Sequence, residues 1–195
     1  MIKKLLNPIE YFNDRKLLLF NFLIFIIGTI IAILMKGWFS SVIQLLFKSE
    51  VNIYETTTEN IIVIILLTIV FFSAGKIINK KTRLIDCLNL SFYTRIPFYL
   101  ISLLNFKGSL SRIMPIKLED GSIKIPSTNA LYNTSDYIIS FITSCLNILV
   151  IIFLIIVIYR SFRTLSNAKK TIDYVIFIAI FLIVTILSPI ILNLI

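Results

Sequence analysis

Arg95 is the residue whose chemistry most needs an explanation. It lies in LSFYTRIPFYL, residues 90–100, an apolar segment in which a charged side chain is unexpected. A guanidinium group inside a membrane must meet protein or water, because hydrocarbon offers it no acceptor. Pro97 follows two residues later, and a proline inside a helix removes the hydrogen bond to the carbonyl group four residues earlier, here that of Tyr93. The sequence therefore places a cation close to a carbonyl oxygen that lacks its usual donor.

Two interpretations of Arg95 are open. If a membrane-spanning helix begins near Leu90, Arg95 lies about 7.5 Å from its start, at about 1.5 Å per residue, and its long side chain reaches the cytoplasmic headgroups. If the helix begins near Leu84, Arg95 lies at mid-depth and must bind other protein groups or water. Polar side chains near a broken helix are typical of solute sites in membrane proteins, but they are equally typical of helix packing. Arg95 is therefore either an anchor or part of an internal site.

The groups that usually carry catalysis are scarce. The chain has no histidine, which removes the commonest general base and metal ligand. An aspartyl protease of the membrane needs two embedded aspartates, whereas Asp86, Asp136 and Asp173 all lie near the ends of apolar segments. Cys87 and Cys145 lie in different apolar segments and resemble small buried apolar residues rather than a disulfide pair. We therefore expect no enzyme activity, no metal site and no cofactor.

The elements that position Arg95 are expected to be membrane helices. Apolar residues make up 58% of the 195-residue chain and charged residues only 15%, compared with about 25% charged residues in soluble domains. The third of five long apolar segments is the weakest, because it contains Asp86 and Asn89 as well as Arg95 and Pro97. We predict one all-α membrane domain, residues 1–195, with five transmembrane helices of about 20 residues each. Their expected bounds are residues 17–35, 58–78, 84–104, 138–159 and 172–194.

Basic residues predict the orientation of these helices. With the N-terminus inside, each cytoplasmic segment carries a cluster of lysine and arginine residues, whereas acidic and basic residues balance on the external side. Positive residues favour the cytoplasmic face, so we expect the N-terminus inside and the C-terminus outside. Attraction to anionic lipid headgroups then accounts for the net charge of +9, and no nucleic-acid partner is expected. The expected headgroup contacts are Lys80, Lys81, Arg83, Arg160, Arg163, Lys169 and Lys170.

Two short interfacial helices are expected beside the five spans. NPIEYF, residues 7–12, predicts a helix on the cytoplasmic leaflet, with Asn7 as its N-cap and Pro8 at the first helical position. WFSSVIQLLFKSE, residues 38–50, predicts a helix along the external interface, because its main apolar residues share one helical face. A plain loop is the alternative for this second segment.

Three further local signals refine the plan. TTTE, residues 56–59, predicts a capping box that starts the second span. PIKLEDGSIKIP, residues 115–126, predicts a small external β-hairpin with its Asp-Gly turn at residues 120–121. The Ser-Pro pair at residues 188–189 predicts a bend or a freed carbonyl group near the outer end of the fifth span.

FYTRIP, residues 92–97, resembles the Tyr-[Ser/Thr]-x-x-Pro signature in the third span of the Yip1 family. Tyr93, Thr94 and Pro97 carry the resemblance, and Arg95 lies within the motif. The family is similar in plan, with five spans, a cytoplasmic N-terminus and a proline-containing helix before the first span. The resemblance implies a five-span Yip1 domain, and it makes Tyr93, Thr94, Arg95 and Pro97 the candidate site residues.

These observations favour a non-enzymatic membrane protein of the scaffold or interaction type, which organises lipids or partner proteins. A component of a small-solute transporter or permease is the alternative. The expected partners are the lipid bilayer and either other membrane proteins or further copies of this chain. Abundant isoleucine, asparagine and lysine suggest an AT-rich genome, so the expected location is a bacterial cytoplasmic (inner) membrane.

Overall fold

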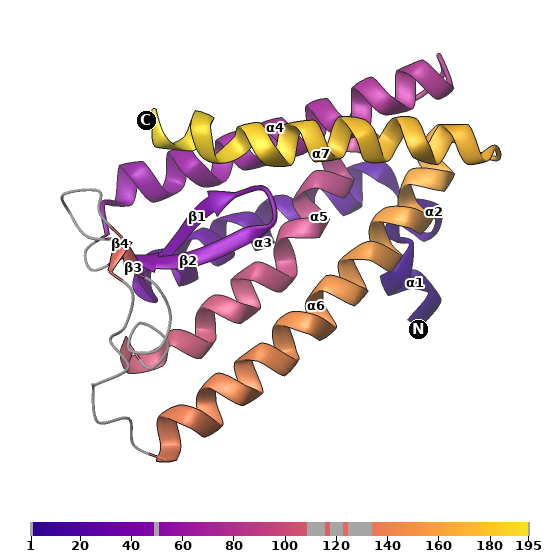
Figure 1. Ribbon diagram of the computed structural model, residues 1–195. Coiled ribbons are helices and arrows are strands. Elements are labelled where there is room, and N and C mark those ends of the chain that lie inside the picture. The colour runs from indigo at the N-terminus through magenta and orange to yellow at the C-terminus, as the bar shows by residue number, and fades with distance from the viewer. Residues whose placement is uncertain (1, 49–50, 109–115, 118–122, 125–133, 195) are drawn as a thin grey trace.

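The computed structural model describes residues 2–48, 51–108, 116–117, 123–124 and 134–194. Within these residues, five helices are long and apolar enough to cross a membrane, which confirms the predicted number of long apolar helices. They form the bundle seen in Figure 1, as expected of a multi-pass membrane protein. The five are α3 (Asp14–Leu34), α4 (Ile53–Ile78), α5 (Leu84–Ser102), α6 (Thr134–Ser166) and α7 (Thr171–Asn193).

α5 is the most enclosed of the five helices. It packs against α3, α4 and α6 (Figure 1) and continues into the 3₁₀ helix η1 (Leu103–Gly108). Of its apolar stretch 67% is buried, compared with 17% for α6 and for α7. This difference explains why α5 has the weakest apolar character, because a helix surrounded by protein can carry polar side chains that lipid would not tolerate.

α4 begins earlier than the capping box at residues 56–59 predicts. Its N-cap is Asn52, whose side-chain oxygen accepts a hydrogen bond from the backbone N–H of Tyr54 at 2.9 Å. Glu59 is buried inside the helix and pairs with Lys48 at 2.9 Å. The predicted start of this span is therefore wrong. The ion pair between Lys48 and Glu59 favours a helix that begins before the capping box. The local capping signal does not reveal this contact.

The segment expected to form an external helix, residues 38–50, contains a β-hairpin instead. β1 (Gly37–Ser41) pairs antiparallel with β2 (Gln44–Lys48). Lys36 adopts a left-handed conformation, with φ 57°, and turns the chain back after α3. The hairpin lies among the helices and contacts α3, α4 and α7 (Figure 1). The helix prediction fails because β1 is buried at every position, so its sequence lacks the alternation that marks a half-buried strand.

A second hairpin joins the first. β3 (Ile116–Lys117) pairs antiparallel with β4 (Ile123–Lys124), which confirms the predicted strand pairing. The predicted turn at residues 120–121 lies outside the described residues. β3 also pairs parallel with β2, with Phe47 opposite Ile116, so the strands form one sheet in the order β1-β2-β3-β4. Because an isolated two-stranded hairpin is marginally stable, the second hairpin depends on the first.

The N-terminal segment forms α1 (Ile2–Leu6) and α2 (Pro8–Tyr11), and both contact α6. Proline is the first residue of α2, as predicted, but the Asn7 side chain does not cap the helix. Its amide nitrogen donates instead to Glu10 Oε2 at 2.6 Å and to Thr164 Oγ1 of α6 at 2.9 Å. Asn7 is therefore the N-cap residue of α2, as predicted, but without a side-chain capping bond.

Candidate functional site

Arg95 lies inside the bundle, with 0% of its surface exposed. α5 begins at Leu84, so Arg95 is in the middle of the helix. A side chain that reaches the headgroups would be exposed at the end of the bundle. Complete burial therefore excludes the snorkelling interpretation and leaves an arginine with internal partners.

The guanidinium group of Arg95 binds the tip of the β1–β2 hairpin. Nη1 donates a hydrogen bond to the carbonyl oxygen of Val42 at 2.8 Å. The guanidinium carbon lies 4.7 Å from the ring centroid of Phe39 and 4.5 Å from that of Phe98, and each ring face attracts a cation by about 0.5–2 kcal/mol. The Tyr99 side chain also lies close to this guanidinium group. No carboxylate in the described part of the chain forms an ion pair with this cation.

A second helix binds the same hairpin tip. Ser188 Oγ of α7 accepts a hydrogen bond from the backbone N–H of Val42 at 3.2 Å and donates one to the carbonyl oxygen of Thr185 at 3.0 Å. Pro189 leaves that carbonyl group without its helical donor, so the serine hydroxyl replaces the missing bond. The sequence predicts a bend or a freed carbonyl group at this point, and the Ser188 hydroxyl satisfies the carbonyl group that Pro189 frees. We refer to Val42, Arg95 and Ser188 as the hairpin-tip cluster.

The four motif residues of α5 do not converge on one site. The Tyr93 hydroxyl donates to the carbonyl oxygen of Leu5 in α1 at 2.9 Å, and Thr94 Oγ1 donates within α5. Arg95 binds the hairpin tip rather than the Tyr93 carbonyl group that Pro97 leaves without a helical donor. The motif therefore joins α5 to two neighbouring elements, α1 through Tyr93 and the hairpin tip through Arg95.

Asn60 and Tyr99 form a further contact that the sequence analysis does not identify. Asn60 Nδ2 of α4 donates to the Tyr99 hydroxyl at 2.9 Å and to Thr29 Oγ1 of α3 at 2.8 Å. The Tyr99 ring lies so close to Gly28 that a Cβ atom at residue 28 would be 2.2 Å from ring atom Cδ2. Isolated polar residues inside apolar runs are the available sequence signal, and they do not indicate which helix each side chain meets.

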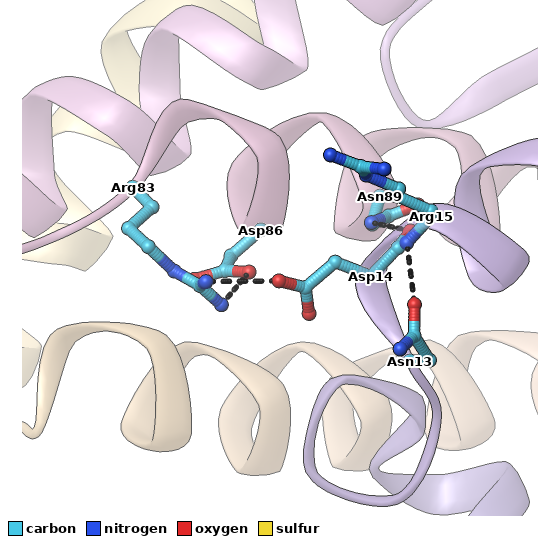
Figure 2. Close-up of polar contacts among 6 residues, drawn as sticks. All are labelled: Asn13, Asp14, Arg15, Arg83, Asp86 and Asn89. Atoms are coloured by element: carbon cyan, nitrogen blue, oxygen red, sulfur yellow. Dashed lines mark hydrogen bonds and ion pairs between the residues drawn. The ribbon is translucent and has the colours of Figure 1, made fainter.

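Figure 2 shows a polar cluster at the start of α5. Arg83 donates to both carboxylate oxygens of Asp86, at 2.9 and 2.8 Å, and pairs with Asp14 Oδ2 of α3 at 2.8 Å. Asn89 Nδ2 donates to the carbonyl oxygen of Asp14 at 3.2 Å, and the carbonyl oxygen of Asn89 accepts from Asn21 at 3.1 Å. The hydrogen bond and charge of Asp86 raise the pKa of Arg83 above its ordinary value. This predicted headgroup contact is thus already paired with two carboxylates.

The other predicted headgroup residues belong to the α4–α5 loop, to the end of α6 and to the α6–α7 connection. Figure 1 shows the α6–α7 connection and the N-terminal helices at the same end of the bundle. Arg160 and Arg163 of α6 line one cleft together with Lys169 from the α6–α7 connection. In the described residues, no group of three or more histidine, cysteine, aspartate or glutamate side chains could hold a metal ion. Of these predicted headgroup residues, Lys80, Lys81 and Lys170 are exposed outside the cleft.

Comparison of the chain with protein-family models, with curated proteins and with solved structures finds no match. The resemblance of residues 92–97 to the Yip1 signature therefore stays a prediction. The basis for a functional proposal is the geometry of the bundle itself.

Proposed function

We propose that this protein is a non-enzymatic membrane scaffold, which organises lipids or partner proteins, further copies of the chain included. The observation that carries the proposal is the contrast between its interior and its α5–α6 face. Inside, the polar side chains of α5 bind other elements of the same bundle, as Arg95 binds the hairpin tip and Tyr99 binds α4. Between α5 and α6, an apolar groove of about 490 Å³ stays open. An open apolar groove beside a closed interior favours binding over conduction.

Two residues of the Yip1-like motif line this groove. Tyr93 and Pro97 line it from α5, and Leu146, Leu149 and Phe153 line it from α6. In a bilayer this groove would face acyl chains or a helix of another membrane protein. The motif would then mark a docking surface, which agrees with a scaffold role.

We infer a bacterial cytoplasmic membrane, with the N-terminus inside and the C-terminus outside, from the distribution of basic residues. Tyr54 at the start of α4 is 84% exposed, and Lys80 is exposed in the α4–α5 loop. In a background with Cys87→Ala and Cys145→Ala, a membrane-impermeant maleimide added to intact cells should label Tyr54→Cys and spare Lys80→Cys. Labelling of Lys80→Cys alone would reverse the orientation.

Site-specific photo-crosslinking in native membranes tests the scaffold role. A photoreactive amino acid at Leu149 in the groove should crosslink to one partner protein or to one lipid class. Ile186 of α7 is the matched control, because it is 69% exposed but is not part of the groove. The same mixture of bulk-lipid adducts at both positions would contradict a docking role for the groove.

A component of a small-solute transporter or permease is the second candidate, and one observation favours it. Nε and Nη2 of the buried Arg95 have no acceptor in hydrogen-bonding geometry among the described residues. Spare donors on an internal cation suit an anionic solute. Uptake of labelled organic anions into proteoliposomes should be compared between the wild type and Arg95→Lys. Uptake that depends on Arg95 would replace the scaffold proposal.

A further inference from the structure

A cleft of about 680 Å³ opens where α2 meets the end of α6. Its walls combine basic side chains with tyrosine rings. Arg160, Arg163 and Lys169 supply the positive charge, and Tyr11 and Tyr159 supply the rings.

The end of α6 explains how the basic residues come together. Arg160 and Arg163 are three residues apart and therefore share one face of the helix. Asn167, with φ 54°, follows the last helical residue in a left-handed conformation, as asparagine and glycine often do at helix ends. The chain then turns so that Lys169 lines the same cleft. On the opposite wall, the hydrogen bond from Asn7 to α6 fixes the position of α2.

The charges of the cleft are not balanced. Glu10 is the one carboxylate among its lining residues, and its Oε2 already accepts a hydrogen bond from Asn7 at 2.6 Å. The ion pairs of the described residues involve Lys48 and Arg83 and none of the three cleft cations. Three cations facing one carboxylate leave a positive site that suits a phosphate group.

The tyrosines indicate that the cleft lies at the boundary between hydrocarbon and water, where tyrosine is enriched. The ring of Tyr159 stacks on Tyr174 with 5.1 Å between centroids, and Tyr159 ends the long apolar part of α6. Ile155 and Ile152 precede it by one and two turns on the same helical face, and they are 62% and 49% exposed. A lipid with its phosphate in the cleft can lay an acyl chain along these isoleucines. This continuity favours a membrane lipid over a free phosphate ion.

We propose that the cleft binds the phosphate group of an anionic membrane phospholipid. Arg160 and Arg163 of α6 are the main donors, and Lys169 of the α6–α7 connection is the third. The inference rests on the proposed function, and it assigns the lipid partner to one site. Diffuse attraction to headgroups requires no cleft. Lys80 and Lys81, which are exposed basic residues outside the cleft, are therefore the matched comparison.

Native mass spectrometry of the full-length protein tests this site. The protein is released from nanodiscs of phosphatidylglycerol and phosphatidylcholine in equal amounts, and the wild type should retain phosphatidylglycerol. Arg160→Gln/Arg163→Gln should lower its retention at least roughly 30-fold, because two guanidinium groups lose their charge-assisted hydrogen bonds to the phosphate group. Lys80→Gln/Lys81→Gln should leave retention nearly unchanged. Equal losses in the two double variants would overturn the proposal, because they indicate diffuse attraction.

Inorganic phosphate is the second probe. It should not displace phosphatidylglycerol from the wild type, and displacement would overturn the assignment to a lipid. If Arg160→Gln/Arg163→Gln does not fold, as judged by size-exclusion chromatography, Lys169→Gln replaces it. That variant should lower retention about fivefold, and unchanged retention would overturn the proposal. If Leu149 still crosslinks but the protein does not retain phosphatidylglycerol, the lipid site in the cleft is wrong and the scaffold proposal stands. If the Leu149 crosslinks are absent, the scaffold proposal is wrong.

Discussion

Two arginines at different points of α5 meet opposite surroundings. Arg83, at the start of the helix, has 59% of its side chain exposed and pairs with the carboxylates of Asp14 and Asp86. Arg95, in the middle, is fully buried and binds a backbone carbonyl group and two aromatic rings. One helix therefore begins in a solvated ion-pair cluster and continues into a dry contact with the hairpin tip.

The difference indicates which of the two arginines contributes more to the stability of the bundle. An exposed ion pair contributes about 0.2–1 kcal/mol, because water competes for both charges. A buried cation has already lost its hydration, so the loss of any remaining partner is much more costly. Arg95 is therefore expected to fix the position of the hairpin. Arg83 is expected to make a smaller contribution, to the contact between the start of α5 and α3.

The largest effect is expected for Arg95→Ala. The substitution leaves the Val42 carbonyl oxygen without its donor and opens a cavity beside Phe39 and Phe98. The free energy of unfolding should therefore fall by about 3–5 kcal/mol, measured by denaturant unfolding in detergent. Arg95→Lys keeps the charge but loses the planar group that stacks on the rings, and its stability should be intermediate. A fully stable Arg95→Ala would erase the contrast between the two arginines.

Gly28→Ala should also destabilise the dry part of α5. The new Cβ atom would meet the Tyr99 ring at 2.2 Å, and Asn60 fixes the hydroxyl end of that ring. Overpacking of this kind costs about 1–3 kcal/mol, and thermal unfolding in detergent measures it. Gly37→Ala is the control, because its Cβ atom would lie 3.3 Å from the flexible end of Leu45. Similar losses for the two substitutions would contradict close packing around this half of the helix.

The helices are predictable from the sequence because their signal is local. Each long apolar run is visible without knowledge of its neighbours, and α5 is correctly the weakest of them. The hairpin is not predictable in this way. Arg95 and Val42 are 53 positions apart, and strands buried on both faces place apolar residues at helical as well as strand spacing. The pattern of residues 38–50 therefore predicts a helix when it is considered alone. Only the burial of the segment among the surrounding helices shows that it is a hairpin.

For the candidate sites, the sequence reveals the chemistry but not the geometry. Pro189 predicts a freed carbonyl group, yet the hairpin tip beside Ser188 follows only from the fold. The position of Arg160 and Arg163 after an apolar run predicts that they contact headgroups. Their convergence with Lys169 depends on the left-handed backbone of Asn167 and on the docking of α2. Neither of these features has a sequence signal strong enough to predict it.

A double-mutant cycle can test which groups Arg95 binds in the buried half of α5. Arg95→Lys and Ser188→Ala both act on Val42, so their effects on the free energy of unfolding should deviate from additivity by at least about 0.5 kcal/mol. Arg95→Lys and Pro97→Ala should be additive, because Arg95 does not bind the carbonyl group that Pro97 frees. Denaturant unfolding in detergent supplies all the values. Coupling to Pro97 without coupling to Ser188 would mean that Arg95 serves the break in α5 rather than the hairpin.

The smallest effect is expected for Arg83→Gln, in the solvated half. The substitution removes ion pairs in which the guanidinium group is exposed but the Asp86 carboxylate is only 8% exposed. Because the glutamine amide can still donate one hydrogen bond to Asp86, the free energy of unfolding should fall by only about 1 kcal/mol. This loss should shrink when the salt concentration rises from about 0.1 M to 1 M, because the screening length falls from about 10 Å to 3 Å. Unfolding in detergent at the two salt concentrations measures the change.

Salt separates the two arginines better than pH does. Asp86 raises the pKa of Arg83 above its already high ordinary value. The contribution of this pair is therefore complete below that ordinary value and is lost only as the pH rises through the raised one, far above neutrality. Salt ions do not reach the fully buried guanidinium of Arg95, so the loss caused by Arg95→Lys should be the same at both salt concentrations. An equal salt response at Arg83 and Arg95 would mean that water enters the hairpin-tip cluster, and the division of α5 into a solvated and a dry half would be wrong.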